Sequence, residues 1–353
     1  MSNLKTESIP LKAVQLEAVV TTNIVAGESV CITGPSGVGK TDIGKKSIEN
    51  AIKILGGGHR MVVHPGTGEP TDAKGLPCMT VNGAEFSPYG WLRRMRDATE
   101  PLFVQVEDLG HAVPAMQAAM MQVMYGKNVN DITISDHVRF ICTTNRKCDR
   151  NAGVNTILDP LKKRLLMLEF IPDLGEWQVW AAANGIRKEV IAYLSLMKQY
   201  FCQDAETNDT TVTPHPRGWH RVSRQLNLNH STDVQPAVFA GCVGPEAGPG
   251  FAGFLRVYDN LVMPASVWAD PATAPIPRQI DALWALMTAL AEEVNNRTIG
   301  KLLVYLQRIL DDHREHAMLC LHAMAARDPS LQATAEYISA AQGPLGRLML
   351  GVK

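Results

Sequence analysis

An octapeptide near the N-terminus has the residue types and the spacing of a phosphate-binding loop. Residues 34–41 (GPSGVGKT) fit the pattern G-x-x-x-x-G-K-[ST] without a mismatch. Backbone N–H groups of residues 37–40 are expected to surround the phosphates, since successive amides can form an anion-binding concavity. The Lys40 ammonium is expected to reach the β- and γ-oxygens, and the Thr41 hydroxyl to ligate Mg²⁺. The expected ATP-binding residues are Gly34, Pro35, Ser36, Gly37, Val38, Gly39, Lys40 and Thr41.

Two adjacent carboxylates, Glu107 and Asp108, follow the largely apolar residues 102–106. An ATPase needs one acid in the Mg²⁺ shell and a second acid that polarises the attacking water. The usual order is Asp then Glu, and here it is reversed. Position therefore assigns Glu107 to the magnesium side and Asp108 to the water. Because Asp108 is one methylene shorter than the usual base, we expect slow hydrolysis.

Asn145 is the third polar residue with a predicted role, and it follows a strand predicted over residues 138–144. If the strand over 138–144 lies between the strands that carry the loop and the acids, Asn145 meets both motifs. Its amide is then expected to hold the attacking water or the γ-phosphate. The prediction depends on this placement, because a lone Asn at a strand end is an ordinary turn residue.

The elements that must position these residues alternate between strand and helix. A short buried strand over 29–33 precedes the loop, and a helix over 42–55 follows it, so that its dipole faces the phosphates. Further strands are predicted over 61–64, 102–106, 138–144 and 165–171, whereas the Gly-, Pro- and Thr-rich residues 65–90 predict an irregular excursion. This alternation predicts an α/β fold, a parallel sheet with helices on both faces.

The chain beyond residue 171 has a helical character. Helices are predicted over 176–183, 187–201 and 219–228, then a Gly/Pro-rich interruption over 241–250 and a linker over 264–277. Two or three amphipathic helices are expected to complete the chain. The predicted domains are a nucleotide-binding core over 1–171, a helical lid over 172–262 and a helical region over 263–353.

Composition excludes several classes of protein. The 353 residues carry a net charge of −1, which gives no general attraction to nucleic acid or to an anionic membrane. Seven cysteines without a C-x-x-C pair favour reduced thiols over a disulfide framework. The first 20 residues lack the apolar core of a signal peptide, and no apolar run approaches the roughly 20 residues of a membrane span. A cytoplasmic protein is therefore expected.

Motifs along the chain resemble those of the AAA+ ATPases, and more narrowly of their MoxR-like branch. The resemblance covers nearly the whole chain and is strong over 27–225. Besides the loop, the segments that carry it are 70–77 (PTDAKGLP), 107–119 (EDLGHAVPAMQAA), 144–146 (TNR) with 149–150 (DR), 160–164 (PLKKR), 172–177 (PDLGEW) and 214–219 (PHPRGW).

The resemblance implies further roles. Asn145 matches the first sensor of the family, and Arg217 matches the second sensor, which contacts the nucleotide in cis. Arg164 matches the arginine finger that acts on the nucleotide of a neighbouring subunit, with Arg150 as a second candidate. The family implies an ATP- and Mg²⁺-dependent homo-oligomer, expected to be a hexameric ring, that remodels a protein partner. Proteins with a von Willebrand factor A domain are typical partners.

Departures from the family pattern leave other functions open. Ser36 stands where proline is common, and Leu165 stands where phenylalanine is common. The Glu107–Asp108 order is the departure that affects the residues expected to act in hydrolysis. One alternative is a nucleic-acid motor or loader, which the near-neutral charge and the lack of a recognisable DNA-binding module disfavour. Another is a nucleotide-gated scaffold that binds ATP and hardly hydrolyses it.

Overall fold

The computed structural model of the chain describes residues 9–81, 83–130, 132–146, 155–203, 210–258 and 262–349. The chain divides into two compact units, each described by itself below. Unit 1 contains the chain up to Ile186 together with Gln199–Arg224 and Cys242–Gly244. Unit 2 contains Arg187–Lys198, Gln225–Gly241 and the chain from Pro245 onward. The expected boundaries at residues 171 and 262 stay predictions.

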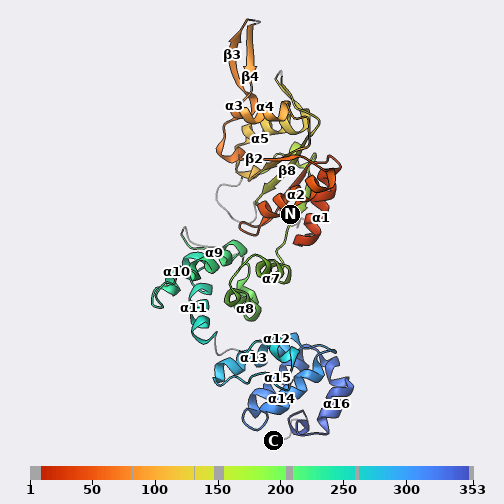
Figure 1. The fold of residues 1–353 in the computed structure, drawn as a ribbon, viewed down its shortest axis with the longest axis vertical. Coiled ribbons are helices and arrows are strands. Elements are labelled where there is room, and N and C mark those ends of the chain that lie inside the picture. The colour runs from red at the N-terminus through yellow and green to blue at the C-terminus, as the bar shows by residue number, and fades with distance from the viewer. Residues whose placement is uncertain are drawn as a thin grey trace, which may run out of the picture. The chain divides into compact units, whose positions relative to one another are not determined.

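A five-stranded sheet is the centre of unit 1 (Figure 1). Its strands, in chain order, are β1 (Val30–Thr33), β2 (His59–Val63), β5 (Leu102–Val106), β8 (Val138–Thr144) and β9 (Leu166–Glu169). They pair in the order β2-β5-β8-β1-β9, and each neighbouring pair is parallel. The three central strands are buried on both faces, which explains their nearly continuous apolar sequences. β8 lies between β5 and β1, as the prediction for Asn145 requires.

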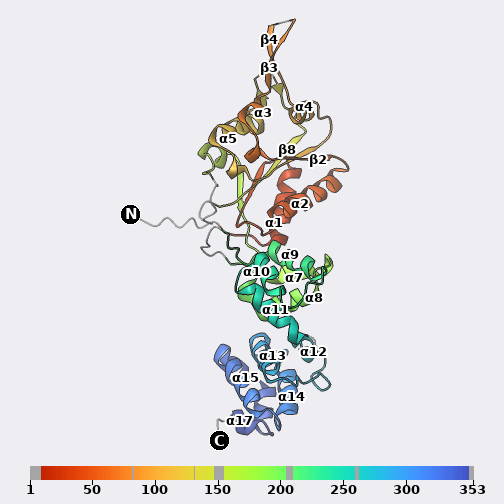
Figure 2. The same cartoon turned by 90° about the vertical axis from the view of Figure 1, so that its left-hand side faces the viewer.

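Helices cover both faces of this sheet, as Figures 1 and 2 show. The helices on one face are α1 (Ala13–Val25) and α2 (Lys40–Leu55). The helices on the other face are α3 (Pro70–Lys74), α4 (Gly90–Arg96) and α5 (Pro114–Met121). Because side chains alternate along a strand, Phe103 packs in the first core while Val104 packs in the second. The expected α/β fold is therefore confirmed.

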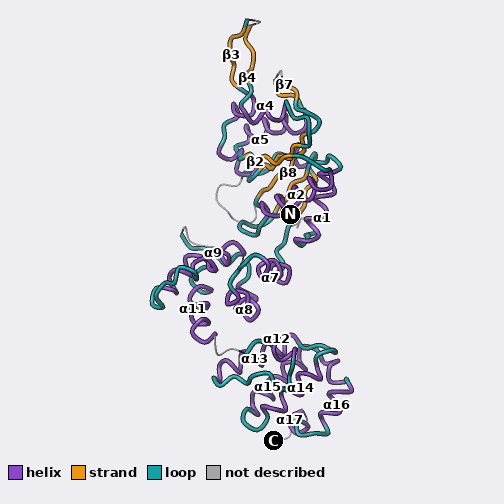
Figure 3. The backbone as a smooth tube through the Cα atoms, viewed as in Figure 1, coloured by secondary structure: helices purple, strands orange, loops and turns teal. Residues whose placement is uncertain are grey.

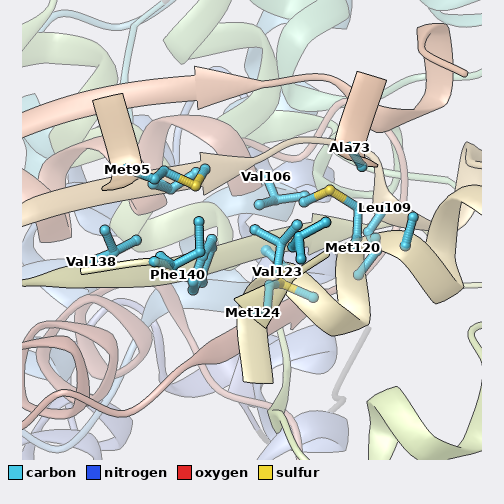
Figure 4. Packing of buried hydrophobic residues seen from close by; sticks show 14 of the residues in the cluster. Ala73, Met95, Val106, Leu109, Met120, Val123, Met124, Val138 and Phe140 are labelled. Carbon is cyan, nitrogen blue, oxygen red and sulfur yellow. Dashed lines mark hydrogen bonds between the residues drawn. The ribbon is translucent and has the colours of Figure 1, made fainter. Parts of the chain in front are cut away.

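The second core is rich in methionine (Figure 4). Met95 of α4 and Met120 of α5 pack with Val106 and Phe140, and all four are nearly inaccessible to solvent. Methionine is unbranched and fills irregular space, which suits the junction of short helices with a sheet. Fully burying one such side chain contributes about 1.5–3 kcal/mol relative to leaving it exposed.

Residues 65–90 are more ordered than their sequence predicts, and the expected irregular excursion is wrong. A 3₁₀ turn (η1, Pro65–Thr67) and α3 lead into β3 (Leu76–Thr80), which pairs antiparallel with β4 (Gly83–Ser87). This hairpin projects from the rest of unit 1 in both views, and Met79 on it is 82% exposed. The sequence did not indicate β3 and β4 because the hairpin has no buried face, so its residues need no alternating apolar pattern.

A second, smaller hairpin follows α5. A π-helical turn, η3 (Gln122–Gly126), leads into β6 (Asn128–Val129), which pairs antiparallel with β7 (Ile132–Thr133). Two short elements also lie in this part of unit 1: η2 (Leu109–His111) and α6 (Asp159–Lys162).

The remainder of the described chain is helical (Figure 3). Its first helices are α7 (Leu174–Ala183), α8 (Lys188–Leu196), η5 (Lys198–Tyr200), α9 (Pro216–Leu226), α10 (Gln235–Val243) and α11 (Ala247–Tyr258). Its later helices are α12 (Pro264–Ala269), α13 (Ile280–Glu293), α14 (Ile299–Ile309), α15 (Arg314–Arg327), η6 (Pro329–Ala333), α16 (Ala335–Ala341) and α17 (Gly346–Met349). Among the described residues, no helix has both the length and the apolar character that crossing a bilayer requires.

Two expectations about this helical part are wrong. Residues 241–250 are not an interruption, because α10 and α11 occupy most of them. Residues 264–277 are only partly a linker, because α12 begins at Pro264, a residue type suited to the first helical turn. Leu302 and Leu306 of α14 join a buried cluster with residues of α12, α13 and α15, which confirms the amphipathic helices near the C-terminus.

Candidate nucleotide-binding site

The phosphate-binding loop joins the end of β1 to the start of α2. Gly39 adopts φ +106° and is the N-cap of α2, so Lys40 is the first residue of the helix. The N–H groups at a helix N-terminus and the helix dipole both favour an anion here. Of the other predicted loop residues, Val38 is buried with Ile48 beneath the loop, whereas Ser36 is exposed. The geometry is that of a phosphate site at a helix N-terminus.

The start of α9 contacts this loop. The backbone N–H of Arg217 donates to the carbonyl of Gly37 at 3.0 Å, and the Arg217 side chain is exposed. A Cβ at Gly37 would lie 2.2 Å from Cδ2 of His215, and Gly37 also has φ +75°, so only glycine fits. The structure thus brings the predicted second sensor, Arg217, against the loop, together with a histidine.

The surroundings of His215 favour the neutral form of its imidazole. Burial lowers its pKa below the ordinary value, and the positive charges of Arg217 and Arg221 act in the same direction. The carbonyl of Thr213, 2.8 Å from Nδ1, opposes this shift. Because a carbonyl only accepts, Nδ1 carries the hydrogen and Nε2 is the acceptor nitrogen of the ring.

Lys40 lies within the loop that it is expected to serve. Its ammonium donates to the carbonyl oxygens of Gly34 (2.9 Å) and Pro35 (2.5 Å), and to Oδ1 of Asn145 (2.8 Å). The lysine is only 7% exposed. Lys40 and Asn145 are 105 positions apart in the sequence. They meet because β8, which precedes Asn145, pairs with β1, which precedes the loop. The structure therefore brings the predicted first sensor to the phosphate loop.

Thr41 and Glu107 meet at the carboxyl ends of β1 and β5. The Thr41 hydroxyl donates to Oε2 of Glu107 at 2.6 Å, and the Thr143 hydroxyl donates to the same oxygen at 2.7 Å. Glu107 is 4% exposed, so these bonds form in a buried setting where a hydrogen bond to a charged group is strong. The two residues predicted to hold Mg²⁺ are thus in direct contact.

Gln105 occupies the other oxygen of Glu107. Its Nε2 donates to Oε1 of Glu107 and to the carbonyl of Thr41, the latter at 2.9 Å. Its Oε1 accepts from Nε of Arg60 on β2 at 2.7 Å. Gln105 itself is fully buried. A chain of hydrogen bonds therefore runs from Arg60 to the predicted magnesium side of the site.

Asp108 has a different environment from its neighbour. It adopts the left-handed conformation (φ +52°), and its side chain is 56% exposed. Its backbone N–H donates to the Thr143 hydroxyl at 3.2 Å, so Thr143 contacts both acids. His111 Nδ1 lies 3.9 Å from Oδ1 of Asp108. Glu107 is therefore buried and hydrogen-bonded while Asp108 faces solvent, and the roles assigned to the two acids stay predictions.

Arg164 lies apart from these contacts, on the surface of unit 1. Its guanidinium lies 5.9 Å from the ring centre of Tyr125 and its Nη1 lies 3.1 Å from Sδ of Met121. The side chain is exposed, and its role as a finger stays a prediction. Arg150, the alternative finger, lies outside the described residues.

The cysteines near the site are not placed for chemistry. Cys31 on β1 and Cys142 on β8 are fully buried and adjacent in register. Burial raises the pKa of the Cys31 thiol to about 12 and also raises that of Cys142. A thiol needs a lowered pKa to act as a nucleophile. Both residues therefore serve packing.

The sequence prediction omitted four residues that the structure places at the site: Arg60, Gln105, Thr143 and His215. Gln105 had a usable signal, because it interrupts an apolar strand two positions before Glu107 and thus shares its face. Thr143 had the same signal two positions before Asn145. Arg60 had none, and His215 stood within the segment 214–219 that carries the resemblance but received no role, since its contact with the loop depends on tertiary packing.

No protein-family model matches the sequence, and no curated protein sequence matches it. Similar solved structures include NtrX from Brucella abortus in complex with ADP, with a TM-score of 0.42 and 15% identity over 95% of this chain and 67% of that chain. A RuvB mutant from Thermotoga maritima has a TM-score of 0.39 and 13% identity, covering 93% of this chain and 85% of its own. The replication initiator DnaA bound to AMPPCP and single-stranded DNA has a TM-score of 0.40 and 13% identity, covering 93% and 92%. All three of these solved structures are AAA+ ATPases.

Proposed function

We propose that this chain is an AAA+ ATPase that binds ATP with Mg²⁺ and hydrolyses it. The contact between Thr41 and Glu107, 2.6 Å between hydroxyl and carboxylate oxygens, carries the proposal. It joins the last residue of the phosphate-loop motif to the first acid after β5. A buried carboxylate costs free energy unless it is paired, and the hydroxyl that pairs with this one belongs to the phosphate-loop motif.

The residues fit a magnesium ion. Mg²⁺ takes oxygen ligands, keeps several waters, and binds proteins through one or two carboxylates and substrate phosphates. The Thr41 hydroxyl would be a direct ligand, and Glu107 would accept hydrogen bonds from the waters of the ion. When bound, Mg²⁺ neutralises charge on the β- and γ-phosphates during transfer.

The remaining residues have distinct roles in the proposed reaction. Lys40 exchanges its bonds to Gly34 and Pro35 for bonds to phosphate oxygens. Asn145, already bonded to that ammonium, faces the same position and orients the γ-phosphate or the water. The exposed Asp108 carboxylate accepts a proton from the attacking water, and its short side chain supports slow turnover.

The biological role that we propose follows the resemblance to the MoxR-like branch. Arg164 acts as a finger on the nucleotide of a neighbouring copy in a ring, expected to be a hexamer in the cytoplasm. ATP turnover remodels a protein partner, with a von Willebrand factor A domain protein as the candidate. The exposed guanidinium of Arg164, stacked near Tyr125, supports this part of the proposal.

Two measurements on one pair of proteins test the proposal. Wild-type protein and Lys40→Ala are compared for phosphate release from ATP and for particle size with and without ATP. We expect slow but measurable release and an ATP-favoured oligomer in the wild type, with both absent in Lys40→Ala. A strictly monomeric wild type with ATP bound would contradict the ring, and a wild type without affinity for ATP would contradict the ATPase.

A further inference from the structure

The structure assigns to Gln105 a role that extends the proposed function. We propose that Gln105 is a positioning residue that couples Mg²⁺ to nucleotide binding, by fixing Glu107 relative to the first turn of α2. This inference rests on the proposed function, because it concerns the same nucleotide site. It is carried by the contacts of Gln105 and by the space that Gly44 leaves for it.

The hydrogen bonds of the Gln105 side chain go to Glu107, to Thr41 and to Arg60. Nε2 donates to the Glu107 carboxylate and to the carbonyl of Thr41, and Oε1 accepts from Arg60. These partners fix which end of the amide is nitrogen, because a carboxylate and a carbonyl only accept. A buried amide with satisfied donors and acceptor has one orientation, so the carboxylate that it bonds is also held in one orientation.

Thr41 is attached to Gln105 through its backbone and to Glu107 through its side chain. The Thr41 carbonyl accepts from Gln105, while the Thr41 hydroxyl donates to Glu107 at 2.6 Å. The three residues therefore close a ring of contacts. Without Gln105, both Oε1 of Glu107 and the Thr41 carbonyl lose a hydrogen-bond donor. The position of the Glu107 carboxylate relative to the Thr41 hydroxyl is then no longer fixed by a residue of β5.

Gly44 supports the same conclusion independently. It lies inside α2 and is buried, and glycine in a helix interior is unfavourable relative to alanine. A Cβ at this position would lie 3.2 Å from Nε2 of Gln105, closer than an ordinary van der Waals contact. Gly44 has no positive φ to explain it. The glycine is therefore explained by the room that Gln105 needs.

The role is one of positioning, because Gln105 contacts Glu107 and Thr41, the residues proposed to hold Mg²⁺ and its waters. Partners of metal ligands typically change metal affinity or activity by about 10–100-fold when they are removed. The effect should appear in the contribution of Mg²⁺ to nucleotide binding. Binding measured without Mg²⁺ depends on the loop amides and Lys40, and it should not change.

The test is the affinity for a fluorescent ATP analogue in excess Mg²⁺ and in EDTA, for wild-type protein and Gln105→Met. Methionine has a similar length and lacks the amide. We expect the factor by which Mg²⁺ tightens binding to fall about 10–100-fold in Gln105→Met, while the affinity in EDTA stays that of the wild type. Gly44→Ala, which crowds Gln105 without deleting it, should lower the same factor in the same direction.

A matched control separates positioning from loss of stability. Gln117 is also fully buried, donates to the carbonyl of Ala112 at 3.1 Å and accepts from the N–H of Leu158 at 3.1 Å. Gln117→Met is therefore the same substitution in another buried amide of unit 1. It should lower the thermal midpoint and leave the Mg²⁺ factor unchanged.

Each outcome is informative. A Gln105→Met protein with the wild-type Mg²⁺ factor, or with affinity lowered equally in Mg²⁺ and EDTA, overturns the inference while the ATPase proposal stands. If Gln105→Met does not fold, the Mg²⁺ factor of Gly44→Ala is the test, and a wild-type factor in that variant overturns the inference. A wild-type protein that does not bind the analogue overturns the proposed function as well, and this is visible before any Gln105 variant is made.

Discussion

The Thr143 hydroxyl donates a hydrogen bond of 2.7 Å to Oε2 of Glu107. The same hydroxyl accepts the backbone N–H of Asp108 at 3.2 Å. One threonine on β8 therefore contacts both acids that follow β5. The parallel register explains this, because Val106 pairs with Cys142 and the next residue on each strand is Glu107 and Thr143.

Replacing Thr143 by valine should impair hydrolysis more than it impairs folding. The change keeps the shape of the side chain and removes both hydrogen bonds, at a stability cost of about 1–3 kcal/mol. We expect phosphate release to fall about 10–100-fold, as for other partners of metal ligands. Thr144→Val is the control, because Thr144 is buried next to it and donates to the Asn145 carbonyl instead. Equal losses in both variants would refute the link.

Asp108 should be required for turnover and dispensable for binding. Asp108→Asn keeps the shape and removes the base, so we expect phosphate release to fall by about 10²–10⁴-fold with nucleotide affinity unchanged. Asp108→Glu restores the usual length of this base and should retain or raise the rate. The measurement is single-turnover phosphate release. An Asp108→Asn protein as fast as the wild type would exclude Asp108 as the base.

Arg164 should act in trans. We expect Arg164→Ala to lose about 10³-fold or more of the hydrolysis rate, the usual effect of an arginine finger, with nearly intact nucleotide binding. Mixing Arg164→Ala with Lys40→Ala should restore part of the activity, because each subunit supplies what the other lacks. Arg164→Lys keeps the charge without the planar fork and tests whether the geometry matters. Collapse of nucleotide binding in Arg164→Ala would instead indicate a role in cis or in structure.

His215 should make the stability of the protein depend on pH. Its pKa is lowered by burial in the folded chain, whereas the unfolded chain has the ordinary value of about 6.5. Between these two values the unfolded chain binds more protons, so the free energy of unfolding falls as the pH falls below about 6.5. We expect His215→Gln to reduce this loss between pH 7 and pH 5 in denaturant titrations. Parallel pH profiles for the two proteins would contradict the prediction.

The parallel sheet and the loop were predictable because each has a local sequence pattern. The buried strands are apolar runs, and the loop is a fixed motif, so both were located within a few residues. The β3–β4 hairpin was not predicted, since it buries no face, and the helix over 264–269 was not predicted either. Local patterns show neither an exposed hairpin nor a short helix that begins with proline.

The site was only partly predictable for a related reason. The sequence indicates Lys40, Thr41, Glu107 and Asn145 through motifs and strand ends. The contact of Lys40 with Asn145 depends on which strands are neighbours, and that is decided by the whole sheet. The contact of His215 with Gly37 depends on how α9 packs in unit 1, and the motif at 214–219 indicated only Arg217.

The bonds that Lys40 makes within the loop bear on how fast a nucleotide can bind. The ammonium is already held by Gly34, Pro35 and Asn145, and Gly37 is already bonded to Arg217. When a nucleotide binds, its phosphate oxygens replace carbonyl oxygens as acceptors for the Lys40 ammonium, which is already in position. Few side chains therefore have to become ordered on binding. We therefore expect association to follow a single fast phase that rises linearly with nucleotide concentration, without the plateau that a slow loop rearrangement would impose.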